Sequence, residues 1–242
     1  EESMKQSLWQ TLMGICLLAV VALLSWQADR LVPVENGQIK AARDRPMVVL
    51  DAGHGGNDPG KVGTGGQLEK DINLAITERL KEYLEASDVE VVLTREKDEA
   101  LYSAGASHKK MSDMKQRCEI IRQAEPDLAV SIHQNSYHEE NVSGGQVFYY
   151  KDSEKGRRLA QILQSRFDYV LGEGNRRKEK ANDSYYLLMH VKAPIVIVEC
   201  GFLSNPAEAG KLEDKEYQDR MAWTIHMGIM EYLNTQESGK GI

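Results

Sequence analysis

The chain is short of cysteine, and its three cysteines are far apart. Cys16, Cys118 and Cys200 form no CxxC pair within the 242 residues. This spacing excludes a disulfide framework and a zinc cluster held by thiolates. The chain also lacks an excess of basic residues, since 30 Lys and Arg stand against 37 Asp and Glu, giving a formal net charge of −7. Because nucleic-acid binding depends on cations that neutralise phosphates, we expect no nucleic-acid partner.

One long apolar run is present, close to the beginning of the sequence. Between Ser7 and Ala28 the only ionisable side chain is Cys16, and Trp9 and Trp26 lie near the two ends. A helix that crosses a bilayer needs about 20 such residues, with aromatic side chains at the interfaces. Residues 1–28 are therefore predicted to form a signal anchor or signal peptide, and we favour an uncleaved anchor. A buried helix of a soluble protein is the alternative, although such a helix is normally amphipathic.

Charge and composition separate the first 46 residues from the rest of the chain. Residues 1–46 hold five acidic and five basic side chains, so the whole charge of −7 belongs to residues 47–242. Residues 29–46 contain Pro33, Gly37 and Pro46 and show no hydrophobic period, which is typical of a linker. We expect one folded domain at 47–235 and a flexible tail at 236–242.

Strand-like and helix-like segments alternate through the predicted domain. Apolar runs rich in β-branched residues predict strands at 47–52, 89–94, 127–133, 146–150 and 195–199. Helical periodicity predicts helices at 69–86, 112–124, 153–171 and 217–233, two of which begin with a serine N-cap, Ser112 and Ser153. This alternation predicts an α/β fold with three layers, α/β/α, around a mostly parallel twisted sheet of about six strands.

Ionisable side chains follow three of the predicted strands. His54 lies in a glycine-rich loop after the first strand, and His133 and Glu199 end two others. Glu69 begins the first long helix, 15 residues after His54. Because sites in such folds form at the carboxyl ends of the strands, we expect these four side chains to gather at one edge of the sheet.

Two imidazoles and two carboxylates are the groups that hydrolysis with zinc requires. His54, Glu69 and His133 are predicted to bind one Zn²⁺ and to leave its fourth position for water. Glu199 is predicted to act as general base towards the water and then as general acid towards the leaving amine. Structural roles are the alternative: His54 would cap a strand, His133 would pack in the core and Glu69 would interact with the helix dipole. The sequence has no short metal motif such as HExxH.

At these residues the chain resembles the zinc-dependent N-acetylmuramoyl-L-alanine amidases of bacterial cell-wall hydrolysis. The resemblance covers about residues 47–235 and rests on LDAGHGGNDPG (50–60), LEKDINL (68–74), LTR (93–95), VSIHQN (130–135) and IVECGFLSNPAEAGKL (197–212). It implies that His54, Glu69 and His133 bind the metal and that Glu199 is catalytic. It also implies hydrolysis of the amide between the lactyl group of N-acetylmuramic acid and the first L-alanine of the stem peptide in peptidoglycan.

Within that family, the chain is most similar to the spore-cortex amidases of endospore formers. The N-terminal anchor, the lack of a wall-binding repeat and the stretch Tyr185–His190 carry this similarity. It implies stem-peptide removal so that a separate deacetylase can make the muramic-δ-lactam needed in germination. It further implies an extracytoplasmic location between forespore and mother cell, and we expect an activating protein partner. The sequence departs from the family at Lys97–Met114, which is longer and more polar, and at Arg177, where glycine is common.

Asn135 and Arg176 are predicted to contact the substrate. Arg176 belongs to the basic run 176–180, which would attract an anionic wall locally but would alternatively form a solvated loop. We expect the remaining histidines and Cys118 and Cys200 to have solvated or packing roles; these histidines are His108, His138, His190 and His226.

Two other functions remain open on the same fold. One is a catalytically silent module that binds the wall or a partner, and the other is a zinc peptidase that cuts within the stem peptide. Glu199 favours an enzyme over the silent module, because a protein that only binds needs no general base.

Overall fold

The computed structural model describes residues 43–103, 105–172 and 175–238, together with Met13, Leu17, Leu18 and Val20. The chain divides into two compact units, Glu1–Asp44 and Arg45–Ile242. Apart from the four residues named, which are helical and exposed, the predicted N-terminal anchor lies outside the described residues, as do most of the linker and part of the tail. Within the described part of the chain, no helix has the length and hydropathy needed to cross a membrane.

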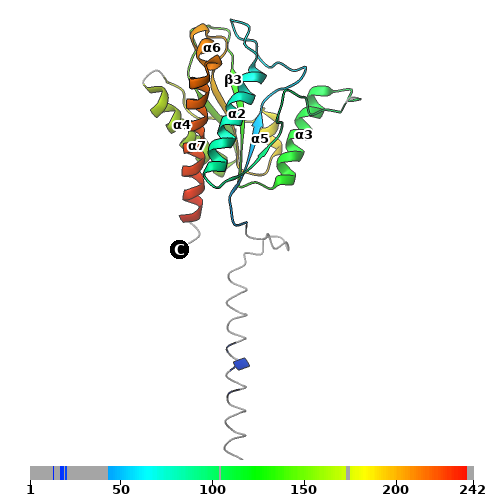
Figure 1. Cartoon of the computed structure of the whole chain (residues 1–242), viewed down its shortest axis with the longest axis vertical. Helices are drawn as coiled ribbons and strands as arrows, with labels where there is room; N and C mark the ends of the chain where they lie inside the picture. The colour runs from blue at the N-terminus through cyan, green and yellow to red at the C-terminus, as the bar shows by residue number, and fades with distance from the viewer. Residues whose placement is uncertain are drawn as a thin grey trace, which may run out of the picture. The chain divides into compact units, whose positions relative to one another are not determined.

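Six strands form one sheet in the order β2-β1-β3-β6-β4-β5. In Figure 1, helices α2 (Glu69–Ala86) and α7 (Lys215–Ser238) lie side by side in front of this sheet. Strand β1 is parallel to β2 and β3, and β3 is parallel to β6. Strand β4 is antiparallel to β6 and parallel to β5. The mostly parallel sheet of about six strands is therefore confirmed. The strands are β1 (Met47–Ala52), β2 (Glu90–Leu93), β3 (Leu128–Asn135), β4 (Gln146–Tyr150), β5 (Lys180–Asn182) and β6 (Ile195–Phe202).

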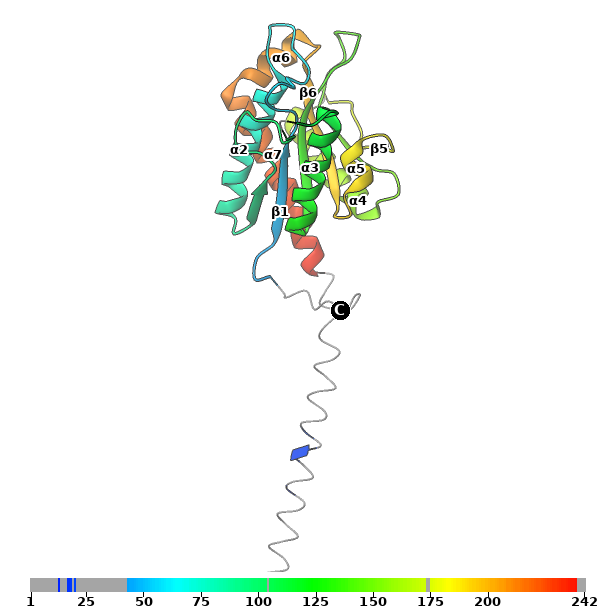
Figure 2. The same cartoon turned by 90° about the vertical axis from the view of Figure 1, so that its right-hand side faces the viewer.

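Helices cover both faces of the sheet and complete the predicted three layers (Figure 2). On one face, alternate strand residues such as Val48 and Leu50 pack against α2 (Glu69–Ala86), α4 (Glu154–Leu171) and α7 (Lys215–Ser238). On the other face, Val49 and its neighbours pack against α3 (Lys109–Ala124) and α5 (Tyr186–His190). Because both faces are covered, every residue of β1 and β6 is buried, as in other parallel sheets.

The ends of the helices test the two serine caps that the sequence predicts. Ser153 is the N-cap of α4, and its side-chain oxygen accepts a hydrogen bond of 3.0 Å from the Gly156 N–H. The prediction for Ser112 is wrong, because α3 begins three residues earlier at Lys109. The residue at the N-cap is His108, whose side chain makes no capping bond. The polar start of α3 has no apolar spacing by which its first turn could be recognised.

Three short elements have no counterpart among the predicted segments. Strand β5 has three polar or small residues, and α5 has five residues, so neither is long enough to show a hydrophobic period. Helix α6 (Pro206–Glu213) does carry a signal. Its N-cap, Asn205, accepts hydrogen bonds from the N–H groups of Ala207 and Glu208, and Pro206 occupies the first position, a combination typical of helix starts.

Two strands extend beyond their predicted ends. Strand β3 continues to Asn135 and β6 continues to Phe202, so His133 and Glu199 lie within strands. The two residues are directly aligned in neighbouring parallel strands. Since aligned residues of such a pair point to the same face of the sheet, the register alone brings the imidazole and the carboxylate together.

Candidate active site

His54 lies in the turn after β1, where its backbone φ is 64°. This left-handed conformation costs a non-glycine residue about 1–3 kcal/mol and is concentrated at functional sites. The imidazole Nδ1 lies 2.9 Å from Asp58 Oδ2, and Nε2 lies 3.2 Å from Glu69 Oε2. Burial lowers the pKa of His54, but the contacts with Glu69 and Asp58 outweigh burial and raise the pKa above its ordinary value.

Glu69 is the first residue of α2, and its side chain is buried. Its Oε1 lies 2.9 Å from His133 Nδ1 and accepts a hydrogen bond from the Gln134 N–H, and its Oε2 accepts one from the Lys61 N–H. Burial would raise the pKa of Glu69, but the bonds from His133 and His54 hold it well below its usual range. The group is therefore a carboxylate at neutral pH.

His133 packs closely against the backbone that carries His54. A β-carbon on Gly53 would lie 2.2 Å from His133 Cε1, so only glycine fits beside this ring. The two imidazole rings are 5.1 Å apart between centroids and meet edge to face. The absence of a side chain at Gly53 thus lets the two histidines approach each other.

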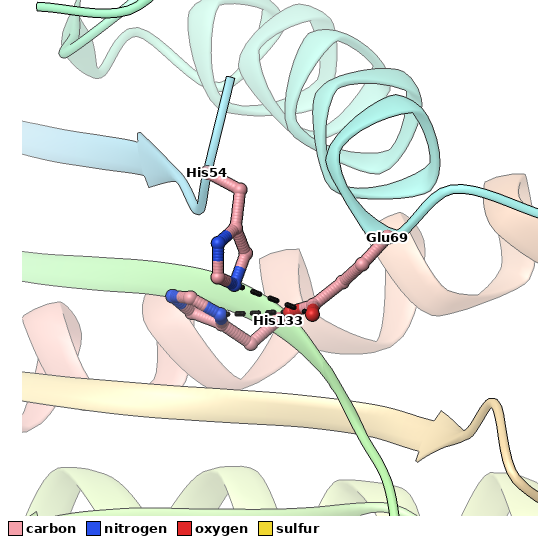
Figure 3. Close-up of side chains that lie close together, drawn as sticks. All are labelled: His54, Glu69 and His133. Atoms are coloured by element: carbon pink, nitrogen blue, oxygen red, sulfur yellow. Dashed lines mark hydrogen bonds and ion pairs between the residues drawn. The ribbon is translucent and has the colours of Figure 1, made fainter. Parts of the chain in front are cut away.

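The structure brings the three predicted ligands together (Figure 3). One donor atom each from His54, Glu69 and His133 lies within 4.8 Å of the other two. Figure 3 shows both imidazoles directed at the Glu69 carboxylate, from the turn after β1 and from β3. Two imidazole nitrogens and one carboxylate oxygen suit zinc, and three protein ligands are the number typical of a catalytic site. Asp58 is placed to orient His54 through its other nitrogen, as carboxylates often do for metal-binding histidines. The residues present therefore fit a zinc ion.

Glu199 lies beside this cluster on β6 and is almost completely buried. Its Oε2 is buried and has no hydrogen-bond partner among the described residues. Burial raises the pKa of Glu199 to about 7, although the nearby histidines oppose this shift. A carboxyl group with a pKa near neutrality exchanges protons readily, which is what general acid–base catalysis requires.

Tyr185 packs on the same face of the sheet, and its sequence position predicts no role for it in the site. Its ring packs edge to face on Phe148, with 5.5 Å between ring centroids, and Phe148 is aligned with Ile197 on β6. Burial together with the negative charges of Glu199 and Glu69 raises the pKa of Tyr185 to about 12. The Tyr185 phenol therefore stays protonated at neutral pH.

A buried ion pair supports the turn that carries His54. Arg117 Nη1 lies 2.6 Å from Asp51 Oδ1, and Arg117 Nη2 donates a hydrogen bond to the carbonyl oxygen of His54. Burial would raise the pKa of Asp51, but Arg117 and hydrogen bonds from Ser131 and Thr94 lower it to about 2. Neither partner of this pair could be assigned to the other from their positions in the sequence.

The two predicted substrate contacts are placed differently. Asn135 ends β3 close to His133, and its side-chain oxygen accepts a hydrogen bond from the Ser136 N–H. Arg176 is exposed. The neighbouring Arg177 instead packs against the protein, with its guanidinium 4.9 Å from the centre of the Phe202 ring and its Nε donating to the Ser143 carbonyl. A role of Asn135 or Arg176 in substrate binding stays a prediction.

The other histidines and cysteines that the structure describes lie outside the cluster. His226 packs between helices and is hydrogen-bonded to Ser87, and His190 stacks on Tyr186. Cys200 alternates with Glu199 along β6 and is buried in the core, as expected for the opposite face of a strand. Cys118 packs partly buried on the α3 side of the sheet.

Comparison with known proteins supplies the family. A family model described as N-acetylmuramoyl-L-alanine amidase matches residues 48–231. The germination-specific N-acetylmuramoyl-L-alanine amidase of Bacillus subtilis (strain 168) is 39% identical over 190 residues, which are 77% of this chain and 79% of the relative.

Solved structures of similar proteins agree with the family match. The CwlD amidase from Clostridioides difficile, in complex with the GerS lipoprotein, has a TM-score of 0.76 and 40% identity, covering 79% of this chain and 100% of that chain. The catalytic domain of CwlV, an N-acetylmuramoyl-L-alanine amidase from Bacillus (Paenibacillus) polymyxa var. colistinus, has a TM-score of 0.68 and 31% identity, covering 78% and 98%. These relatives are enzymes, which favours an enzyme over the silent module. The chain therefore belongs to the N-acetylmuramoyl-L-alanine amidase family, as its sequence motifs predicted.

Proposed function

We propose that the chain hydrolyses the amide between N-acetylmuramic acid and L-alanine with the help of one Zn²⁺ ion. The observation that carries this proposal is the convergence of His54, Glu69 and His133, with the buried Glu199 aligned beside His133. Two histidines and one glutamate bind the metal, and Glu199 is left free for proton transfer. The cell-wall amidases among the relatives support the choice of substrate.

Each residue of the site has a defined task. Zn²⁺ held by these three side chains supplies Lewis-acid chemistry, because it polarises a carbonyl group and makes a water molecule more acidic. Glu199 takes a proton from the attacking water as the water oxygen bonds to the lactyl carbonyl carbon. The same carboxyl group then gives that proton to the alanine nitrogen as the C–N bond breaks. The second proton of the water is released when the new carboxylic acid ionises, so the products are a lactyl carboxylate, a proton and a stem peptide with a free L-alanine amino group.

The spore cortex is the proposed location of this reaction. The Bacillus subtilis relative named as germination-specific is 39% identical, which supports a role in germination. Removal of stem peptides from cortex muramic acid would prepare it for deacetylation and formation of the muramic-δ-lactam. This role requires the catalytic domain to be exported to the extracytoplasmic side of a membrane.

One experiment tests both the reaction and the substrate. The purified full chain, loaded with Zn²⁺, is incubated with cortex and with vegetative peptidoglycan. We expect new L-alanine amino termini, more from cortex, and their loss on chelation and return with Zn²⁺. New amino termini at other stem-peptide residues would instead indicate a zinc peptidase. Zinc occupancy without any new L-alanine termini, alone or with a lipoprotein partner, would contradict the proposal.

Residues 1–28 are proposed to anchor the chain in the membrane, and residues 29–46 to link this anchor to the catalytic domain at 47–235. The apolar run from Leu12 to Trp26 supports the anchor. On membrane fractionation, the full chain is expected in the membrane fraction and a chain beginning at Arg30 in the supernatant. Equal distribution of the two chains would contradict the anchor.

A protein partner is also part of the proposal. The structure of the Clostridioides difficile CwlD amidase is a complex with the GerS lipoprotein. A lipoprotein and an anchored amidase would meet at the same membrane surface, which supports a partner of this class for the present chain.

A further inference from the structure

One buried side chain contacts all three segments that carry the candidate ligands. Asn73 lies one turn after Glu69 on α2 and has no exposed surface. Its Nδ2 donates a hydrogen bond of 3.1 Å to the carbonyl oxygen of Gly53, the residue before His54, and lies 3.4 Å from Glu69 Oε1. Its Oδ1 accepts a hydrogen bond of 3.1 Å from Nε2 of Gln134, the residue after His133. Both N–H groups and the carbonyl oxygen of this amide are therefore used.

These contacts close a ring of hydrogen bonds around the Glu69 carboxylate. The Gln134 backbone N–H donates to Glu69 Oε1 at 3.1 Å, while the Gln134 side chain donates to Asn73 and Asn73 returns to Glu69. Glu69 Oε1 is thereby fixed on the side of His133, and Oε2 is left facing His54. The ring thus determines which carboxylate oxygen approaches which imidazole.

We propose that Asn73 is a positioning residue that sets the mutual geometry of His54, Glu69 and His133 for metal binding. This inference rests on the proposed zinc site, and it adds a residue that touches neither the metal nor the substrate. Partners that orient metal ligands typically change metal affinity by about 10–100-fold when they are removed. Because Asn73 is hydrogen-bonded to all three segments that carry the ligands, its loss is expected to change the positions of all three ligands and not of one alone.

The test compares two buried amides of the full chain. Asn73→Ala removes the ring of hydrogen bonds around the Glu69 carboxylate. Gln164→Ala removes a buried amide on α4 that is hydrogen-bonded to Val147, Gly145 and Asp168, away from the ligands. We expect Asn73→Ala to weaken zinc binding by about 10–100-fold in competition with a chelator, and Gln164→Ala to leave it close to wild type. The visible spectrum of the Co²⁺-substituted chain is expected to change only in Asn73→Ala, because it reports ligand geometry.

The outcomes separate this inference from the proposed function. If the wild-type chain binds no zinc, the zinc-dependent function itself is wrong. If the wild type binds zinc and the two variants bind it equally well with unchanged Co²⁺ spectra, only the role of Asn73 is overturned. Should Asn73→Ala fail to fold, Gln134→Met removes one link of the ring and keeps Asn73 in place. A zinc affinity of Gln134→Met equal to that of wild type would likewise overturn the proposal.

Discussion

Replacing Glu199 with glutamine is expected to lower the turnover number by about 10²–10⁴-fold while zinc remains bound. The reason is that the substitution keeps the shape of the side chain but removes the group that accepts the proton. Glu199 lies beside the ligand cluster without belonging to it, since the three donor atoms that approach one another come from His54, Glu69 and His133. The measurements are kcat on peptidoglycan and the zinc content of the purified chain.

The control for this variant is the loss of a ligand. His54→Ala and His133→Ala are expected to lose both zinc and activity, because two remaining donors do not make a catalytic zinc site. If Glu199→Gln lost its zinc as the histidine variants do, Glu199 would be a ligand and the division of tasks at the site would be wrong.

Replacing Arg117 with leucine is expected to lower the free energy of unfolding by about 3–5 kcal/mol. The substitution leaves the carboxylate of Asp51 buried without its ion-pair partner, and it keeps the hydrogen bonds from Ser131 and Thr94. Removing one member of a buried pair costs more than the pair itself contributes, since the remaining charge is desolvated. Urea unfolding of the zinc-free chain at neutral pH measures this loss.

Arg122→Leu provides the matched comparison on the same helix. Arg122 pairs with Glu119 at the surface of α3, so its replacement is expected to change the free energy of unfolding by less than about 0.5 kcal/mol. Similar stabilities of the Arg117 and Arg122 variants would show that Asp51 needs no buried cation.

The sheet and the ligand cluster could be predicted from the sequence because both depend on long regular signals. Strands β1 and β4 and helix α2 have the predicted bounds, since a short apolar run marks each strand and a helical period of apolar residues marks the helix. His54 and His133 follow or end apolar strands, and parallel strands bring such positions to one edge. Glu69 is found at the first residue of the first long helix, where the helical periodicity of residues 69–86 predicted it.

The supporting contacts could not be predicted, because they join polar residues across long stretches of sequence. Asp51 and Arg117 are 66 residues apart, and Asn73 and Gln134 are 61 apart. Neither pair belongs to a periodic sequence pattern. Each of these polar side chains would be equally compatible with a solvent-exposed position. Asp51 and Arg117 become neighbours only when α3 packs on one face of the sheet. Asn73 and Gln134 become neighbours only when α2 packs on the other face.

The order of the strands also governs when the enzyme can become active during synthesis. Strand β6 comes last along the chain among the described strands, yet it lies between β3 and β4 in the sheet. Until β6 is synthesised, one edge of β3 is unpaired. The pair formed by β4 and β5 then has no hydrogen bonds to β1, β2 or β3. The predicted metal ligands are complete at residue 133, but the proposed proton carrier arrives with this final strand. A chain that ends before β6 therefore has neither the complete sheet nor Glu199. Hydrolysis of the wall is thus expected only after nearly the whole domain has been synthesised.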